Sequence, residues 1–154
     1  MDPKQDYVAY LREKVGHSPI LIAHSALVVL NDANEILIEI RGDDGNQDIP
    51  GGGLELNETF EEAAVRELQE ETGIIADSLE LLHIYSGPIT YYKYANGDEI
   101  YGADAIYIVK NYHGELSPQA QEVKELRFMK LDDVRFASPR NKDILKRLKE
   151  YLHK

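Results

Sequence analysis

The sequence predicts an α+β domain, or an α/β/α sandwich, and three observations lead to this expectation. Helical patterns occur near the start of the chain, after its central glycine-rich stretch and at its end. Runs of β-branched and aliphatic residues lie between these helices and have the length of strands. No repeat, low-complexity tract or linker interrupts the 154 residues, so we expect one domain over residues 1–154.

Composition and charge limit the classes of partner. Seventeen basic and 28 acidic residues give a net charge of −11, which argues against a nucleic-acid polymer or an anionic membrane as the main partner. Small phosphorylated ligands stay open, provided that metal ions accompany them. The chain contains no cysteine, which excludes disulfides, thiolate metal sites and a cysteine nucleophile.

The beginning of the sequence does not resemble a targeting segment. Its first ten residues, MDPKQDYVAY, have no basic region followed by an apolar core. The longest apolar stretch, residues 19–30, is too short to span a bilayer and is interrupted by His24 and Ser25. We therefore expect a cytoplasmic protein.

A helix is predicted within the N-terminal segment, residues 1–16. Its helical pattern runs over residues 4–14 and has Tyr7, Val8 and Leu11 on an apolar side. Two roles are open for this side: it covers the domain's own core, or it contacts a second copy of the chain in a homodimer.

Two strands follow, and we predict that they pair as a hairpin. Residues 20–30 form a β-branched, aliphatic run that is typical of a buried strand. Residues 36–41, ILIEIR, alternate well enough to pair with it across the turn NDANE. Residues 42–53 are polar and rich in glycine, and we interpret them as a loop.

The second half of the chain predicts further strands and a closing helix. The pair Asn96-Gly97 marks a hairpin turn between two aromatic strands. Ser138-Pro139 opens an amphipathic helix over residues 138–152. The other strand candidates are residues 79–86, 103–110 and 125–130.

The central helix belongs to the stretch GGGLELNETFEEAAVRELQEETGI, residues 51–74. Thr59 and Glu62, three positions apart, form a capping box, and Gly73 is placed to end the helix. On a helical projection the apolar side chains form one stripe, which consists of Phe60, Ala64, Val65 and Leu68. To this extent the helix is an ordinary amphipathic one.

Three carboxylates share a narrow arc of this helix. With Phe60 set at zero, Glu67, Glu70 and Glu71 fall at about 340°, 280° and 20°, so Glu71 lies at the edge of the apolar stripe. Two carboxylates about 4 Å apart repel by roughly 4 kcal/mol at an effective dielectric constant of 20. An Arg66–Glu70 pair returns only about 0.3–0.5 kcal/mol. Either this face is solvated, or a hard divalent cation such as Mg²⁺ belongs beside it.

Residues 51–74 resemble the Nudix box, the motif G-x5-E-x7-R-E-U-x-E-E-x-G-U, in which U is a bulky aliphatic residue. Every position of the motif is matched, by Gly52, Glu58, Arg66, Glu67, Leu68, Glu70, Glu71, Gly73 and Ile74. Seven strict positions should match by chance about once in 10^8 positions. The flanking strands and the closing helix also suit the Nudix fold, an α/β/α sandwich with a mixed β-sheet.

The resemblance implies a hydrolase that cuts the pyrophosphate bond of a nucleoside diphosphate linked to another moiety, with Mg²⁺, or Mn²⁺, as cofactor. Its partner would be a small nucleotide-derived substrate. The implied metal ligands are Glu67, Glu70 and Glu71, helped by the carbonyl of Gly52.

The family also implies a general base and supporting residues. Members of the family differ on the base, which is either the glutamate at Glu67 or one on a later loop. Here Glu122 is the later candidate, as base or further ligand, and Glu125 is the second choice. Arg66 is expected to orient Glu67, and Glu58 is expected to be structural.

Candidates for substrate binding have plainer alternatives. Arg41 follows a strand beside the glycine-rich stretch, where it meets a phosphate or is an ordinary surface arginine. Tyr92 and Tyr101 stack on a base, or they form cross-strand aromatic pairs within a hairpin.

The substrate class is left open by conflicting features. Pro88 lies where the ADP-ribose-cleaving subgroup has a proline, whereas Tyr91 resembles a feature of the dinucleoside polyphosphate group. A nucleoside triphosphate, for example an oxidised one removed from the precursor pool, is a third class. A non-catalytic nucleotide-sensing domain is a further alternative, although such domains usually have a damaged box.

Overall fold

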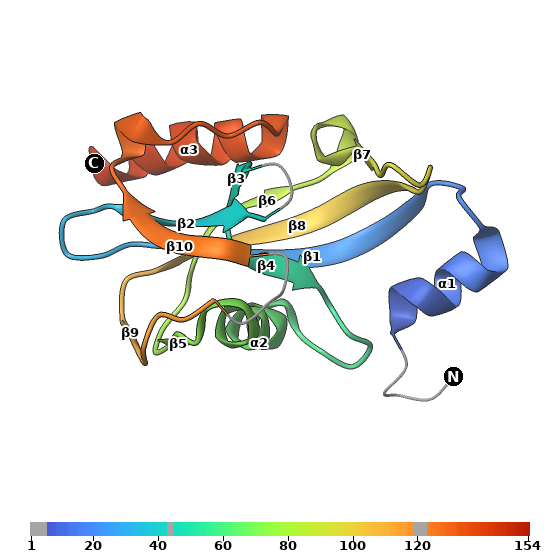
Figure 1. Cartoon of the computed structure of the whole chain (residues 1–154), viewed down its shortest axis with the longest axis horizontal. Coiled ribbons are helices and arrows are strands. Elements are labelled where there is room, and N and C mark those ends of the chain that lie inside the picture. Colours follow the sequence, from blue (N-terminus) through green and yellow to red (C-terminus); the bar gives the residue numbers. More distant parts are fainter. Residues whose placement is uncertain (1–5, 43–44, 119–122) are drawn as a thin grey trace.

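The computed structural model describes residues 6–42, 45–118 and 123–154. Its longer elements are arranged as Figure 1 shows. In chain order the elements are α1 (Tyr7–Val15), β1 (Ile20–Val29), β2 (Ile36–Arg41), β3 (Gln47–Asp48), β4 (Gly51–Gly53), α2 (Phe60–Thr72), β5 (Ile75–Ala76), β6 (Glu80–Tyr85), the 3-10 helix η1 (Gly87–Thr90), β7 (Tyr92–Lys93), β8 (Glu99–Val109), β9 (Tyr112–His113), β10 (Val123–Met129), η2 (Leu131–Asp133) and α3 (Pro139–Leu152).

The strands form a curled layer with α2 on one side and α3 on the other (Figure 1). The larger sheet has the order β4-β1-β8-β6, with β7 paired to β8, and a second sheet has the order β10-β2-β3. β1 and β8 run parallel, whereas β1 and β4, and also β6 and β8, run antiparallel. The predicted α/β/α sandwich with a mixed β-sheet is therefore confirmed.

Both faces of the central strand β1 are buried from Ser25 to Val29, which explains the apolar run in this half of the strand. Leu27 and Val29 belong to one apolar cluster with Leu68 of α2. Val28 belongs to a second cluster with Ile144 of α3. The layer therefore separates two cores, one under each helix.

The predicted hairpin between residues 20–30 and 36–41 is wrong. Within the described residues, β1 and β2 meet at a single bridge between Leu30 and Ile36. β1 pairs instead with β8 and β4, and β2 pairs with β10 and β3. An apolar pattern identifies a buried strand but does not choose its partner, because the partner is decided by segments far away in the sequence.

The stretch predicted as a loop, residues 42–53, contains the short strands β3 and β4. In β4, Gly51 lies opposite Ala26 of β1. A Cβ atom at Gly51 would lie 2.6 Å from the carbonyl oxygen of Ser25, so only glycine allows this close pairing. The pairing holds the glycine-rich strand beside α2.

The predicted turn at Asn96-Gly97 is confirmed. Gly97 has a φ of 97°, and its N–H donates to the carbonyl oxygen of Tyr94 at 3.0 Å. β7 and the beginning of β8 form the two sides of this hairpin. The strand expected at residues 103–110 is thus the later part of a longer strand.

The closing helix is also confirmed as an element. Ser138 precedes α3 and accepts a hydrogen bond from the N–H of Asn141 at 3.0 Å. Ile144 and Leu148 are fully buried under the sheet. No helix within the described ranges is long and apolar enough to cross a membrane.

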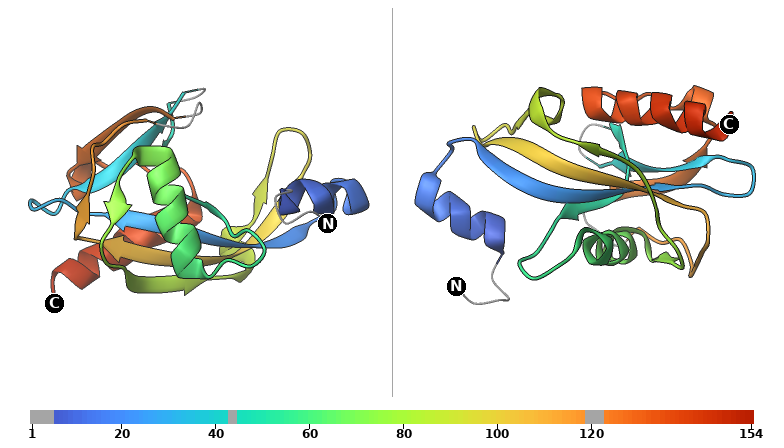
Figure 2. Two further views of the ribbon diagram at one scale, coloured as in Figure 1. Left: turned by 90° about the horizontal axis from the view of Figure 1, so that it is seen from below. Right: turned by 180° about the vertical axis from the view of Figure 1, so that it is seen from behind.

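α1 projects from one end of the layer, next to the β7–β8 hairpin (Figure 2). None of its residues, all of which are described, is buried. The guanidinium of Arg12 fastens the helix to the hairpin: it donates to the carbonyl oxygen of Glu99 at 2.8 Å and lies 3.5 Å from the Asp98 carboxylate. The apolar side of α1 therefore does not cover the domain's core, and a homodimer contact stays a prediction.

Candidate active site

The caps predicted from the sequence hold α2 in place. The hydroxyl of Thr59 accepts from the N–H of Glu62 at 3.0 Å, and the Glu62 carboxylate accepts from the N–H of Thr59 at 3.0 Å. Gly73 ends the helix in the left-handed conformation, with a φ of 80°. Ala64 and Leu68 are fully buried, so the helix is fixed with its carboxylates beside β4.

Arg66 connects the acidic helix to the glycine-rich strand. Its guanidinium donates to the two oxygens of Glu58 at 2.6 and 2.9 Å, and to the carbonyl oxygen of Gly53 at 3.1 Å. It also donates to Glu67 at 2.9 Å and to Glu70 at 3.2 Å. The hydrogen bonds from Arg66 lower the pKa of Glu58. One guanidinium thus donates hydrogen bonds to three carboxylates, and it limits the movement of Glu67.

Two glycines bring the backbone against the carboxylates. The N–H of Gly51 donates to the Glu71 carboxylate at 2.7 Å. A Cβ atom at Gly52 would lie 2.4 Å from an oxygen of Glu67, so the carboxylate fills the space that a side chain would need. The Glu67 and Glu71 carboxylates therefore lie against the backbone of β4, and Mg²⁺ takes carboxylate and backbone carbonyl oxygens as ligands in proteins.

A further carboxylate, Glu39 of β2, lies at the same place and was missed by the sequence analysis. Leu37 packs in the cluster under α2, so Glu39, two positions later on the strand, points to the same side. Its side chain is fully buried, and neither carboxylate oxygen has a hydrogen-bond partner among the described residues. The available signal was an acid at an inward position of the apolar strand ILIEIR.

Burial and mutual repulsion raise the pKa values of three carboxylates. Burial, followed by the charge of Glu39, raises the pKa of Glu71 to about 9. Burial, followed by the charge of Asp48, raises the pKa of Glu39 to about 7. Burial also raises the pKa of Glu67, although Arg66 opposes this shift. In the absence of a cation the cluster therefore retains protons at neutral pH.

Residues 21–150 match the family model described as the NUDIX domain. The chain belongs to the Nudix family. It is 37% identical over 86 residues to the ADP-ribose pyrophosphatase of Methanocaldococcus jannaschii, which covers 56% of this chain and 47% of that protein. It is 42% identical over 62 residues to the putative 8-oxo-dGTP diphosphatase of Bacillus subtilis, which covers 40% of this chain and 42% of that protein.

A solved Nudix-type structure has the same arrangement of elements. The MutT protein of Methanosarcina mazei Go1 superposes with a TM-score of 0.71 at 17% identity, over 89% of this chain and 99% of that chain. The curated relatives are matched over less than half of their own lengths. The family and the fold are thus shown, and the resemblance of residues 51–74 to the Nudix box is confirmed as family membership.

Two predicted residues of the Nudix site lie at its edge. The Glu70 side chain is 58% exposed and lies 3.2 Å from Arg66. Arg41 shares the strand face of Glu39, and its guanidinium lies 3.7 Å from the Glu39 carboxylate. Arg41 therefore lies beside the carboxylates, and its contact with a phosphate stays a prediction.

The two later-loop candidates for the general base have different outcomes. Glu122 lies outside the described residues, so its role stays a prediction. Glu125 is paired in register with Ile40, which packs in the cluster under α3, so it lies on the strand face away from Glu39. Its carboxylate accepts two hydrogen bonds from one nitrogen of Arg127, at 2.8 and 2.9 Å.

The predicted aromatic residues Tyr92 and Tyr101 lie in the β7–β8 hairpin. The ring of Tyr92 meets the ring of Tyr94 edge to face at 4.7 Å, and the ring of Tyr101 lies 5.2 Å from that of Tyr91. The contact between Tyr101 and Tyr91 joins the two sides of the hairpin, as the plainer alternative predicts, whereas Tyr92 and Tyr94 belong to the same side. The side chains of Tyr92 and Tyr101 are also partly exposed, so a role in base stacking stays a prediction.

The Nudix carboxylates do not form a finished metal site by themselves. Among the described residues, no group of three or more histidine, aspartate or glutamate side chains is arranged to hold a metal ion. The guanidinium of Arg66 donates to one oxygen of Glu67, and the N–H of Gly51 donates to one oxygen of Glu71, so both carboxylates are partly engaged within the chain. The donor set nevertheless fits Mg²⁺, because it consists of hard oxygen atoms and includes the unpartnered, buried Glu39.

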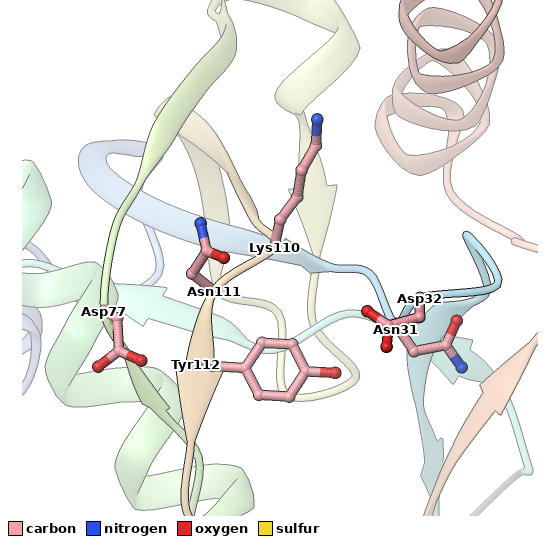
Figure 3. Close-up of a pocket in the computed structure, with 6 residues that line it drawn as sticks. All are labelled: Asn31, Asp32, Asp77, Lys110, Asn111 and Tyr112. Carbon is pink, nitrogen blue, oxygen red and sulfur yellow. The ribbon is translucent and has the colours of Figure 1, made fainter.

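A polar pocket of about 380 Å³, shown in close-up in Figure 3, is lined by other residues than these carboxylates. Its side chains come from the segments that follow β1, β5 and β8, and from β9. It is lined by Asn31, Asp32, Asp77, Lys110, Asn111 and Tyr112. It shares no residue with the Nudix box and is not the candidate active site.

Proposed function

We propose that this chain hydrolyses the pyrophosphate bond of a nucleoside diphosphate linked to another moiety, such as ADP-ribose or a nucleotide sugar. The observation that carries the proposal is that Glu67 and Glu71 lie together against the Gly51–Gly52 backbone. Their negative charge exceeds what Arg66 neutralises. A pyrophosphate is a poor electrophile because its oxygens repel an incoming hydroxide, so an enzyme for this bond must bring cations.

The box residues have two roles: some would bind the metal ion, and Arg66 orients one of these ligands. Glu67, Glu70 and Glu71, with the carbonyl of Gly52, would hold Mg²⁺ or Mn²⁺. The bound ion supplies charge neutralisation, an acidified water and a clamp on the leaving group. Arg66 keeps Glu67 in place through its contact at 2.9 Å and ties the helix to β4 through the carbonyl oxygen of Gly53.

Two further residues would act on the proton and the phosphate. Glu67, in place of holding the metal, or Glu122 takes the proton of the attacking water. Arg41 stands beside the cluster and donates to a phosphate oxygen of the substrate. No nucleophilic side chain is required, which agrees with a chain without cysteine.

A nucleoside triphosphate is the second candidate substrate. The Bacillus subtilis relative is named a putative 8-oxo-dGTP diphosphatase, whereas the Methanocaldococcus jannaschii relative is named an ADP-ribose pyrophosphatase. Both reactions break an anhydride between phosphates and would use the same carboxylates. A non-catalytic sensing role is disfavoured, because the box retains every carboxylate.

A phosphate-release screen tests the proposal. The purified chain is incubated with Mg²⁺ and ADP-ribose, nucleotide sugars, NADH, dinucleoside polyphosphates or oxidised triphosphates. A coupled phosphatase frees phosphate from the monoester products but not from intact linked diphosphates, and inorganic pyrophosphatase replaces it for triphosphates. We expect turnover of at least one linked diphosphate that stops when EDTA removes the metal.

Two results would contradict this proposal. Turnover of triphosphates alone would favour the second candidate. Tight nucleotide binding without turnover of any compound, with Mg²⁺ or Mn²⁺ present, would establish the sensing role instead.

A further inference from the structure

Glu39 lies at a position of β2 whose neighbours on the same face are apolar. Ile36 and Ile38 face the cluster under α3, while Leu37 and Glu39 face α2. Across the strand pair, Glu39 lies opposite Leu126 of β10, which packs against the same α2-side cluster. The carboxylate therefore enters the layer between β2 and α2.

The surroundings of Glu39 give its charge no adequate partner. Its side chain is 1% exposed, and no donor in the described part of the chain hydrogen-bonds to either oxygen. Arg41 approaches to 3.7 Å without a hydrogen bond, and its own side chain is 34% exposed. Of the other charged groups that act on Glu39, Asp48 and Glu67 raise its pKa by repulsion, whereas its contact with the Glu71 carboxyl group lowers the pKa.

A purely structural role does not explain this arrangement. A buried polar group without its hydrogen bonds destabilises the fold, and a charged group does so more strongly. An apolar residue of similar volume at this position would avoid that cost. The neighbouring carboxylate, Glu71, accepts a hydrogen bond from the N–H of Gly51 with one of its oxygens.

We propose that Glu39 is a further metal ligand, supplied by β2 from outside the Nudix box, and that it holds a divalent cation together with Glu71. This inference rests on the proposed function, since it assumes that the box binds a cation. The cation satisfies both orphaned oxygens of Glu39 and removes the repulsion between the two carboxylates.

Binding of Mn²⁺ alone tests the inference without any substrate. Free Mn²⁺ is measured by electron paramagnetic resonance while it is titrated against the metal-free wild-type chain, Glu39→Gln, Glu71→Gln and Glu61→Gln. Glu61→Gln is the matched control. It removes one negative charge from α2, the helix that carries Glu71, at a carboxylate that accepts a hydrogen bond from the hydroxyl of Tyr107. We expect Glu39→Gln to weaken Mn²⁺ binding at least about tenfold and Glu61→Gln to leave it unchanged.

The outcomes separate this inference from the proposed function. If Glu71→Gln weakens Mn²⁺ binding and Glu39→Gln binds like the wild type, the role of Glu39 is refuted while the metal site stands. If the wild-type chain itself binds no Mn²⁺, both claims fail. Should Glu39→Gln not fold, Glu39→Asp takes its place, since it keeps the charge and shortens the reach; wild-type affinity in that variant also refutes the inference.

Discussion

Two buried carboxylates, on opposite faces of the same layer, have opposite surroundings. Asp104 of β8 points toward α3, and its two oxygens are engaged by His24 and by Arg140, each at 2.9 Å. Glu39 of β2 points toward α2, and its oxygens have no hydrogen-bond partner in the described residues. Arg41, at 3.7 Å, is the one cation in the described part of the chain that pairs with it.

The difference shows in their pKa values. Burial alone would raise the pKa of Asp104, but the bond with His24 and the charge of Arg140 outweigh it, so the pKa is lowered. Burial and the charge of Asp48 raise the pKa of Glu39 to about 7. A carboxylate that serves the fold has its cation built in, whereas the cluster around Glu39 depends on a cation from solution.

The largest expected effect is a loss of turnover on substitution in the cluster around Glu39, which has too few cations of its own. Glu71→Gln should lower metal-dependent turnover more than about a hundredfold, because it removes a ligand. The free energy of unfolding without metal should stay the same or rise, because repulsion with Glu39 is relieved. Steady-state kinetics and urea unfolding in EDTA measure the two effects; wild-type turnover would show that Glu71 is not a ligand.

Substitution beside Asp104, whose charge is paired with Arg140, should instead lower the free energy of unfolding. Arg140→Met leaves the Asp104 carboxylate buried and half-partnered, so the free energy of unfolding should fall by about 3 kcal/mol. Arg127→Met is the control, because its pair with Glu125 is half exposed and should matter by less than about 1 kcal/mol. Equal effects in urea unfolding would remove the distinction between the two carboxylates.

The two carboxylates should also give opposite dependences on pH. The pKa of Glu39 is raised above its unfolded value of 4.5, so its contribution to stability is complete below pH 4.5 and is lost as the pH rises through about 7. The pKa of Asp104 is lowered below 3.8, so its contribution is present above that value and is lost as the pH falls.

Urea unfolding in EDTA from pH 3 to 9 measures both limbs. On the alkaline side the loss should be on the order of 3 kcal/mol, and Glu39→Gln should flatten it. A stability that rises from pH 5 to 9 in the wild-type chain would contradict the assignment of an unpartnered charge to Glu39.

The smallest expected change in stability comes from neighbouring glycines. In Gly52→Ala the new Cβ atom would lie 2.4 Å from the Glu67 carboxylate, so that flexible group must move. Turnover should fall by about tenfold to a hundredfold, with less than about 1 kcal/mol of lost stability. Gly53→Ala is the matched control, since a Cβ atom there would lie no closer than 3.6 Å to any neighbouring atom. A similar loss of turnover in Gly53→Ala would show that displacement of Glu67 does not cause the loss in Gly52→Ala.

Local features of the site were predictable from the sequence because they depend on short spacing. Thr59 and Glu62 cap α2, Gly73 ends it, and Arg66 reaches Glu70 one turn away, as helical geometry requires. The apolar stripe of α2 was predictable for the same reason.

Features that depend on contacts distant in sequence were not predictable in this way. The pairing of β1 with β8 joins segments 80 positions apart, as between His24 and Asp104, and periodicity carries no information about it. Glu39 joins the carboxylates of α2 through the same kind of contact, since β2 is folded beside that helix by its pairing with β10. An inward-facing acid on an apolar strand is the only local sign of such a residue.

Anomalous diffraction from crystals soaked in Mn²⁺ tests the central claim most directly. We predict a Mn²⁺ peak bound by the carboxylates of Glu67, Glu70 and Glu71 and by the carbonyl oxygen of Gly52, with Glu39 as a further ligand. Crystals saturated with Mn²⁺ that show no peak between these oxygens would contradict the account.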